Sequence, residues 1–159
     1  MSRKSIGAAL AVAALALAGT ASADTAGKPQ HGQHDRTIRL VEAGKELQPT
    51  FVDTGKPGPS AGDLAIHSDA VLREDASQAG TFRQVCALTD LVGGPFTSTF
   101  ECTGSITLKD GTIAMEGPFT PSQPESVAAV TGGTGRYRTA QGEIVVRAGA
   151  DEILVKLIR

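Results

Sequence analysis

The sequence lacks tryptophan, has one tyrosine and contains only two cysteines. Aromatic residues make up 4% of the chain, so the walls of any cavity would be mainly aliphatic. No segment keeps the i, i+3, i+4, i+7 apolar spacing of an amphipathic helix, because glycine or proline interrupts almost every window. Helical fold classes are therefore not expected.

Long hydrophobic runs are missing as well. The apolar run from Ile6 to Ala18 is shorter than the roughly 20 residues that cross a membrane comfortably. It follows Arg3 and Lys4 and precedes Ala21-Ser22-Ala23, a pattern typical of a secretory signal peptide. We therefore expect residues 1–23 to be a signal peptide and the protein to be secreted into the extracellular space. An uncleaved N-terminal anchor is the alternative.

The chain has no excess of positive charge. Without residues 1–23 it carries 13 basic and 17 acidic side chains, a formal charge of −4. Nucleic acids and anionic membrane surfaces attract clustered positive charge. Neither is therefore an expected partner of the mature protein.

Residues 24–36 are polar, contain glycine and proline and show no apolar periodicity, which predicts a flexible N-terminal tail. The tail contains His31 and His34, which have no third ligand at a fixed distance, and we interpret them as solvated. The sequence thus predicts no metal site and no cofactor. Residues 37–159 are expected to form a single domain.

Nine short runs in that domain alternate apolar and polar side chains, as strands with one buried face do. Between Phe96 and Leu108 the even positions are mostly apolar and the odd positions are all polar. The pair Asp110-Gly111 favours a tight hairpin turn between two runs. The runs predict an all-β sandwich or closed barrel; they span Thr37–Val41, Pro49–Asp53, Asp63–Arg73, Gly80–Thr89, Phe96–Leu108, Thr112–Phe119, Ser126–Thr131, Glu143–Ala148 and Glu152–Ile158.

The two cysteines, Cys86 and Cys102, predict a disulfide in an oxidising compartment, with two buried free thiols as the alternative. A hairpin that turns near Gly94 would place the two cysteines directly opposite each other. Directly opposed residues point to the same side of a sheet. The shared face would then also carry Phe82, Leu88, Phe96 and Phe100.

A glycine-rich turn in residues 128–142 contains Gly132, Gly133 and Gly135, which can supply the positive φ angles of a compact turn. This stretch resembles a segment shared by allene oxide cyclases and dirigent proteins. The resemblance implies an eight-stranded antiparallel β-barrel around an apolar cavity. Members of these families are often dimers or trimers, so a homo-oligomer is a further expectation.

Three more segments resemble the cyclase branch in order and approximate spacing. They are Gly117-Pro118-Phe119-Thr120, which precedes the glycine turn, Gly62-Asp63-Leu64 at the start of a long strand, and Gly80-Thr81-Phe82 followed by Cys86. With the glycine turn they cover about residues 49 to 148.

The catalytic residues of the cyclases carry over to this chain only in part. The resemblance implies a carboxylate on the first strand, a proline that holds a water molecule and an asparagine on the second strand. Pro49 matches the proline and Asp69 takes the asparagine position, whereas the carboxylate falls near Leu40 and matches Glu42 only if the alignment is shifted. An aspartate donates a hydrogen bond only when protonated, so allene oxide itself is not an expected substrate.

The orientation of Asp69 conflicts with plain alternation. If Leu64 and Ile66 face the core, Asp69 and His67 face solvent, and only a β-bulge would turn Asp69 inward. We therefore interpret both side chains as solvent-facing.

The preferred function is binding of an apolar small molecule inside the barrel, with cyclisation or isomerisation steered by shape. The residues expected to line the cavity are Phe82, Cys86, Phe100, Ile106 and Met115. The alternative is a non-catalytic extracellular carrier or structural protein with a packed interior. Both remain open, because eight strands enclose either side chains or one small ligand.

Overall fold

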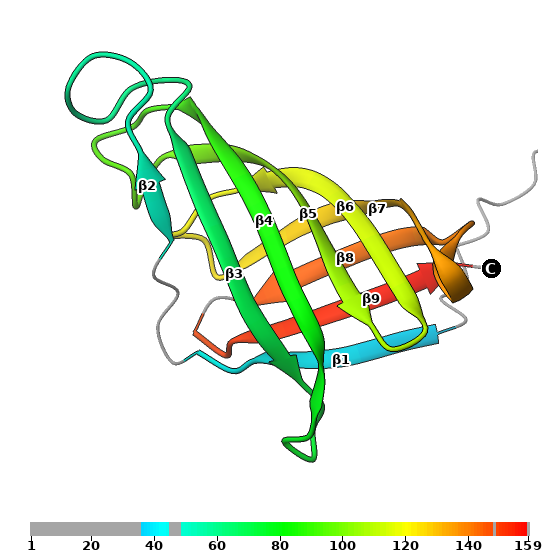
Figure 1. Cartoon of the computed structure of the whole chain (residues 1–159). Coiled ribbons are helices and arrows are strands. Elements are labelled where there is room, and N and C mark those ends of the chain that lie inside the picture. The colour runs from blue at the N-terminus through cyan, green and yellow to red at the C-terminus, as the bar shows by residue number, and fades with distance from the viewer. Residues whose placement is uncertain (1–35, 45–48, 148, 159) are drawn as a thin grey trace, which may run out of the picture. The chain divides into compact units, whose positions relative to one another are not determined.

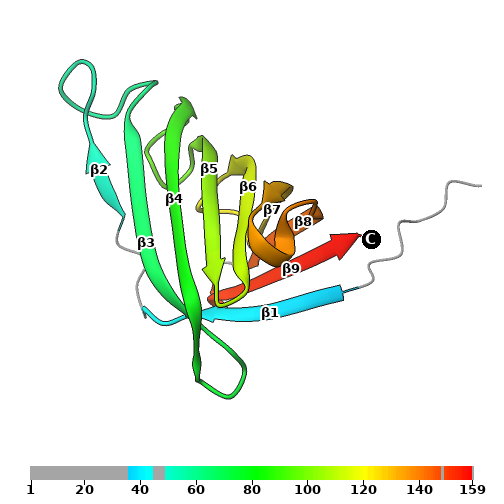
Figure 2. The same cartoon turned by 45° about the vertical axis from the view of Figure 1, so that its right-hand side comes forward.

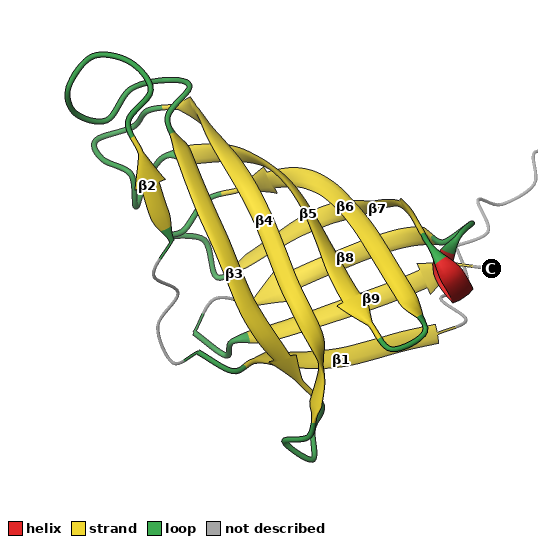
Figure 3. Cartoon of the chain, in the orientation of Figure 1, coloured by secondary structure: helices red, strands yellow, loops and turns green. Residues whose placement is uncertain are grey.

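The computed structural model describes residues 36–44, 49–147 and 149–158. They form nine strands and one 3-10 helix (Figures 1 and 3), and none of their helices is long and apolar enough to span a membrane. The elements are β1 (Arg36–Glu42), β2 (Thr50–Val52), β3 (Leu64–Leu72), β4 (Gln78–Asp90), β5 (Thr99–Leu108), β6 (Gly111–Phe119), β7 (Glu125–Gly133), η1 (Gly135–Tyr137), β8 (Gln141–Arg147) and β9 (Glu152–Ile158). Each predicted run thus overlaps a strand, although β5 begins three residues later than predicted. The predicted signal peptide and residues 24–35 lie outside the described residues.

The strands form one antiparallel sheet in the order β1-β9-β8-β7-β6-β5-β4-β3-β2, and β1 also pairs with β3. This last pairing closes eight strands into a barrel, and β2 pairs with the opposite end of the same edge of β3. The predicted eight-stranded antiparallel barrel is therefore confirmed. β1 pairs with β9 from Arg36 to Val41 but meets β3 only through Val41 and Glu42. The N-terminal part of β1 consequently diverges from β3 (Figure 2).

Two apolar clusters fill different levels of the barrel. Phe82 of β4, Ile106 of β5 and Ile113 of β6 are directly paired and belong to the first cluster, together with residues such as Leu40 and Val71. The second cluster contains Ala65, Cys86, Leu88, Phe100 and Cys102. The level between them contains His67, Gln84, Gly104 and Met115. Three of these four residues are polar or lack a side chain, so the apolar packing is interrupted there.

The predicted disulfide is confirmed. Cys86 and Cys102 are paired across β4 and β5 and are bonded to each other. Leu88 pairs with Phe100 and shares their buried face, as expected. The prediction for Phe96 was wrong, because β5 begins only at Thr99 and the Phe96 side chain is 69% exposed in the preceding loop.

The glycine-rich turn requires glycine for two reasons, positive φ angles and close backbone contact. Gly132 and Gly135 have φ angles of 141° and 56°, as expected. Gly133 has no positive φ, so that part of the prediction was wrong. A Cβ at Gly133 would instead overlap the carbonyl oxygen of Thr112 and lie 2.7 Å from that of Tyr137. The turn is therefore packed against the start of β6 by backbone contact.

The prediction that His67 and Asp69 face solvent was wrong. Ile66 is 41% exposed, whereas His67 is 9% exposed. Asp69 pairs directly with Phe82, which is buried in the core, so Asp69 and His67 share the inner face of β3. The register of β3 with β4 is regular from Leu64 to Val71, so the inward orientation of Asp69 requires no bulge before it.

Candidate functional site

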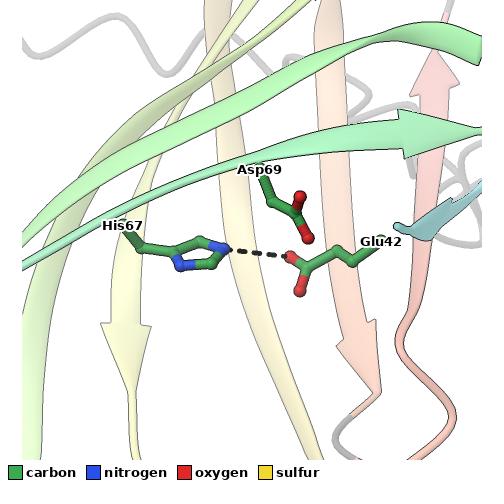
Figure 4. A group of neighbouring side chains, drawn as sticks. All are labelled: Glu42, His67 and Asp69. Atoms are coloured by element: carbon green, nitrogen blue, oxygen red, sulfur yellow. Dashed lines mark ion pairs between the residues drawn. The ribbon is translucent and has the colours of Figure 1, made fainter. Parts of the chain in front are cut away.

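Three ionisable side chains meet inside the barrel where β1 and β3 pair (Figure 4). They are Glu42 at the end of β1 and His67 and Asp69 on β3. One potential ligand atom from each residue lies within 4.8 Å of the others. The pairing of Glu42 with Val71 brings Glu42 to the inner face of β3. His67 and Asp69 are two residues apart and therefore point to that same face.

Glu42 and His67 are buried without a complete set of hydrogen bonds. Their side chains are 2% and 8% exposed, and Glu42 Oε1 lies 3.9 Å from His67 Nε2 (Figure 4). This distance is too long for a hydrogen bond. Among the described residues neither Glu42 oxygen nor His67 Nε2 has a hydrogen-bond partner. The His67 ring packs against Phe82, with 5.9 Å between ring centroids.

Asp69 is held in place by the backbone. The N–H of Gly44 donates a hydrogen bond to Asp69 Oδ2 and the N–H of Ala70 donates one to Oδ1, each at 2.7 Å. A Cβ at position 44 would lie 2.7 Å from Asp69 Oδ2, so a glycine there permits the close approach. Each carboxylate oxygen has a second lone pair, so Asp69 can still accept another contact.

Burial changes the proton affinities of this cluster. Burial raises the pKa of Glu42 from 4.5 to about 7, and the negative charges of Asp69 and Asp151 add to the shift. Burial also lowers the pKa of His67, while Asp69 acts in the opposite direction. At neutral pH the cluster therefore pairs a neutral imidazole with a carboxyl group that can both release and accept a proton, which is what general acid–base catalysis requires.

The raised pKa of Glu42 predicts a pH-dependent stability. The folded state binds this proton more tightly than the unfolded state does, so the stabilisation is present below pH 4.5 and is lost as the pH rises through about 7. Relative to Glu42→Gln, the wild type should lose up to about 3 kcal/mol of unfolding free energy over this range. Denaturant titrations at several pH values, with a chelator in the buffer, measure the difference. Because His67, Asp69 and Asp151 are kept in both proteins, a constant difference would show that Glu42 does not titrate as expected.

A pocket of about 720 Å³ opens where β1 diverges from β3. Its walls include Leu40, Ala79 and Tyr137, which are buried members of the first apolar cluster. Charged residues of both signs surround this apolar floor; they are Arg36, Arg39, Arg73, Glu74, Asp75, Lys109 and Asp110. Leu40 and Glu42 are two residues apart on β1 and are both buried. The pocket therefore lies one side-chain level away from the polar cluster.

A second pocket of about 200 Å³ lies beside the loop from β2 to β3 and is lined partly by Phe51, Leu88 and Phe100. The loop contains Gly58-Pro59-Ser60-Ala61-Gly62, which matches the G-x-S-x-G sequence pattern of a nucleophile elbow. Ser60 leads into β3 rather than into a helix, and its N–H donates to Asp63 Oδ2 at 2.7 Å. The segment therefore lacks the strand–turn–helix arrangement of a nucleophile elbow.

Asp63 organises this loop. It is 8% exposed and accepts hydrogen bonds from the N–H groups of Thr54 and Ser60. These bonds lower the pKa of Asp63, which therefore remains ionised. Its role is to fix the loop between β2 and β3.

The structure brings two of the three catalytic candidates together, Glu42 and Asp69. The third, Pro49, is half-buried and directly precedes β2, where the pairing of Thr50 with Ile66 places it at the level of His67 along β3. His67 was not selected from the sequence. The one feature of the sequence that could have pointed to His67 is its position two residues before Asp69, which places both side chains on the same face of the strand.

The five residues expected to line a cavity are all buried. They do not form one apolar cluster: Phe82, Ile106 and Met115 belong to the first, and Cys86 and Phe100 to the second. Of the five, Phe100 lines the smaller pocket, and none lines the larger one. Their role as ligand contacts stays a prediction.

Comparisons with known proteins show similarity to barrels that are described as enzymes. A family model for the allene oxide cyclase barrel-like domain matches residues 43–154. A solved structure described as pyocyanin demethylase is 32% identical, with a TM-score of 0.63, and the match covers 77% of this chain and 99% of that chain. No curated protein matches the chain.

Two further structures share the fold at lower identity. AbnU, described as an exo-specific intermolecular Diels-Alderase, is 17% identical with a TM-score of 0.50, and the match covers 77% of this chain and 98% of that one. A nonspecific heme-binding cyclase described as catalysing a 4 + 2 cycloaddition is 13% identical with a TM-score of 0.54; 77% of this chain and 64% of that chain are covered.

Proposed function

We propose that this chain, which belongs to the allene oxide cyclase barrel-like family, binds an apolar small molecule in the pocket where β1 diverges from β3. The observation that carries the proposal is the volume of this pocket, about 720 Å³, over an apolar floor. Pockets for small molecules usually measure about 300–1,000 Å³ and combine apolar walls with a few polar groups. The apolar floor would contact the nonpolar part of the ligand, and the charged residues, which make up more than half of the lining, would orient it.

The polar cluster supports a catalytic role for the same barrel. A ligand that displaces the buried Leu40 side chain would reach Glu42 and His67, whose proton affinities suit proton transfer near neutral pH. Such a transfer supports an isomerisation or cyclisation of the bound molecule. The 32% identical structure is described as a demethylase of pyocyanin, which is consistent with chemistry on a small molecule in this fold.

A non-catalytic carrier is the second candidate. It is supported by the dense packing of Phe82, Ile106 and Met115, which leaves the ligand mainly the open end of the barrel. For either role we propose secretion, because the disulfide between Cys86 and Cys102 suits an oxidising compartment.

The pocket can be tested by filling it. Ile38 lines the pocket and is half-buried, so Ile38→Trp should occupy part of the space and weaken ligand binding by about tenfold or more. Suitable probes are an environment-sensitive apolar fluorophore and pyocyanin, the compound in the name of the 32% identical structure. Binding is measured by fluorescence or absorbance titration.

The matched control is Ile158→Trp. Ile158 is 41% exposed on the neighbouring strand β9 and does not line the pocket, so this variant should bind like the wild type. Failure of folded wild-type protein to bind either probe, or equal binding by Ile38→Trp, would contradict the proposal. Binding of pyocyanin without any change to it would favour a carrier of such molecules.

A further inference from the structure

The geometry points to a binding site for a divalent first-row transition-metal ion, formed by Glu42, His67 and Asp69. The site would hold the ion through one imidazole nitrogen and two carboxylates. This inference does not depend on the small-molecule pocket, because the three residues lie deeper in the barrel and do not line it.

The first argument is the uncompensated burial of polar atoms. Both oxygens of Glu42 and Nε2 of His67 lack a hydrogen-bond partner among the described residues, although the two side chains are only 2% and 8% exposed. Buried carboxylates are normally paired with a charge or bound to a metal, because removing them from water is costly. A cation placed between them would give His67 Nε2 and one oxygen of Glu42 a partner at once.

The second argument is the spacing of the ligand atoms. The distance of 3.9 Å between Glu42 Oε1 and His67 Nε2 is too long for a hydrogen bond. Around a tetrahedral ion with bonds of about 2.1 Å, neighbouring ligand atoms lie about 3.4 Å apart. The three residues offer atoms within 4.8 Å of one another, so small side-chain rotations would bring them to a common ion.

The third argument is the support of Asp69. The N–H groups of Gly44 and Ala70 each donate to one of its oxygens at 2.7 Å, which fixes the carboxylate while leaving a lone pair on each oxygen. Metal-binding carboxylates are commonly oriented by such hydrogen bonds. Asp69 is thus already oriented for metal binding, and Glu42 of β1 and His67 of β3 would supply the other two ligands.

The donor set indicates the kind of ion. Imidazole suits zinc, iron, copper and nickel, whereas calcium and magnesium prefer sites made entirely of oxygen. Two carboxylates would neutralise a divalent charge in the barrel interior. Three protein ligands also leave a coordination position for water or a bound molecule, as in catalytic rather than structural zinc sites.

The test uses the full chain, purified without a polyhistidine tag and treated with a chelator. Titration calorimetry with zinc chloride should give one ion per chain, and cobalt chloride should give a visible absorption spectrum that reports coordination. Glu42→Gln, His67→Gln and Asp69→Asn should each weaken zinc binding at least tenfold. Magnesium chloride should not compete.

Two controls keep the test decisive. The other histidines of the chain, His31 and His34, offer a competing site, so a variant with both changed to glutamine should bind zinc like the wild type. Glu42→Gln removes a buried carboxylate and should be at least as stable as the metal-free wild type, so its loss of binding would not reflect unfolding.

Three results would overturn the inference. They are the absence of zinc binding by the wild type, loss of binding only in the variant of His31 and His34, and unchanged binding in Glu42→Gln. The fluorophore titration reports on the pocket separately, so its outcome does not decide this one.

Discussion

Gly133→Ala and Gly135→Ala should each lower the free energy of unfolding by at least about 3 kcal/mol. A single methyl group is enough, because the space it needs is already occupied by backbone. A Cβ at Gly133 would overlap the carbonyl oxygen of Thr112, and a Cβ at Gly135 would overlap that of Asp110. Gly135 also has a φ of 56°, a conformation that alanine adopts at a cost.

The reason for this sensitivity is that two turns interlock. The N–H groups of Thr134 and Arg136 donate to the carbonyl oxygens of Thr112 and Asp110 at 2.8 Å and 2.9 Å. The N–H of Thr112 donates in return to Thr134 Oγ1 at 3.1 Å. An added methyl group would separate the turns and break these bonds, whose donors and acceptors would lose their partners.

A graded series separates steric overlap from backbone strain. Gly94 has no positive φ, and a Cβ added there would meet no atom within 4 Å, so Gly94→Ala should leave stability nearly unchanged. Gly132 has a φ of 141° but open space, so Gly132→Ala should cost roughly 1–3 kcal/mol from strain alone. Denaturant unfolding of the four variants measures the order. Equal stability of Gly133→Ala and Gly94→Ala would refute the steric explanation.

Removal of the disulfide should have the second large effect. Cys86 and Cys102 are 16 residues apart in sequence, so the bridge closes a short loop in the unfolded chain. The double variant Cys86→Ala with Cys102→Ala should lose about 3 kcal/mol of unfolding free energy. The residues also pack in the second apolar cluster at 3% and 2% exposure, so the bridge should resist reductant until the barrel opens. Denaturant unfolding and thiol alkylation provide the measurements.

The packing contribution can be separated from the crosslink. Wild-type protein unfolded and refolded in reductant keeps both sulfur atoms but loses the loop constraint. Its stability should fall nearly as far as that of the double variant, and the remaining difference measures the cavity left by alanine. Ready alkylation of both cysteines in native oxidised protein, or wild-type stability of the double variant, would contradict the expected role of the bridge.

The strand positions and one register could be predicted from local pattern. Alternation is a property of consecutive residues, so each run was visible without knowledge of its neighbours. The pairing of Cys86 with Cys102 followed because the hairpin turn and the apolar face agree with each other. The prediction for Phe96 was wrong because this apolar residue extends the alternating pattern beyond the strand into a loop, where it is 69% exposed.

The candidate site was predictable only in part. Glu42 and Asp69 were selected by resemblance, but the sequence separates them by 26 intervening residues and carries no sign that they meet. Their contact depends on the short pairing of β1 with β3, through Val41 and Glu42, that closes the barrel. His67 was missed because its burial depends on which face of β3 points inward.

The sequence by itself determined the strands, the disulfide and the barrel class, since these depend on local alternation, on one hairpin and on short motifs. Only the tertiary structure decided the inner face of β3. Leu64 and Ile66 make one face of this strand the more apolar, so local pattern alone favours burying that face. The opposite face lies inward because Asp69 pairs with Phe82 of β4, and directly opposed residues point to the same side of a sheet. Since strand side chains alternate with a period of two, this orientation of β3 places both His67 and Asp69 inside the barrel.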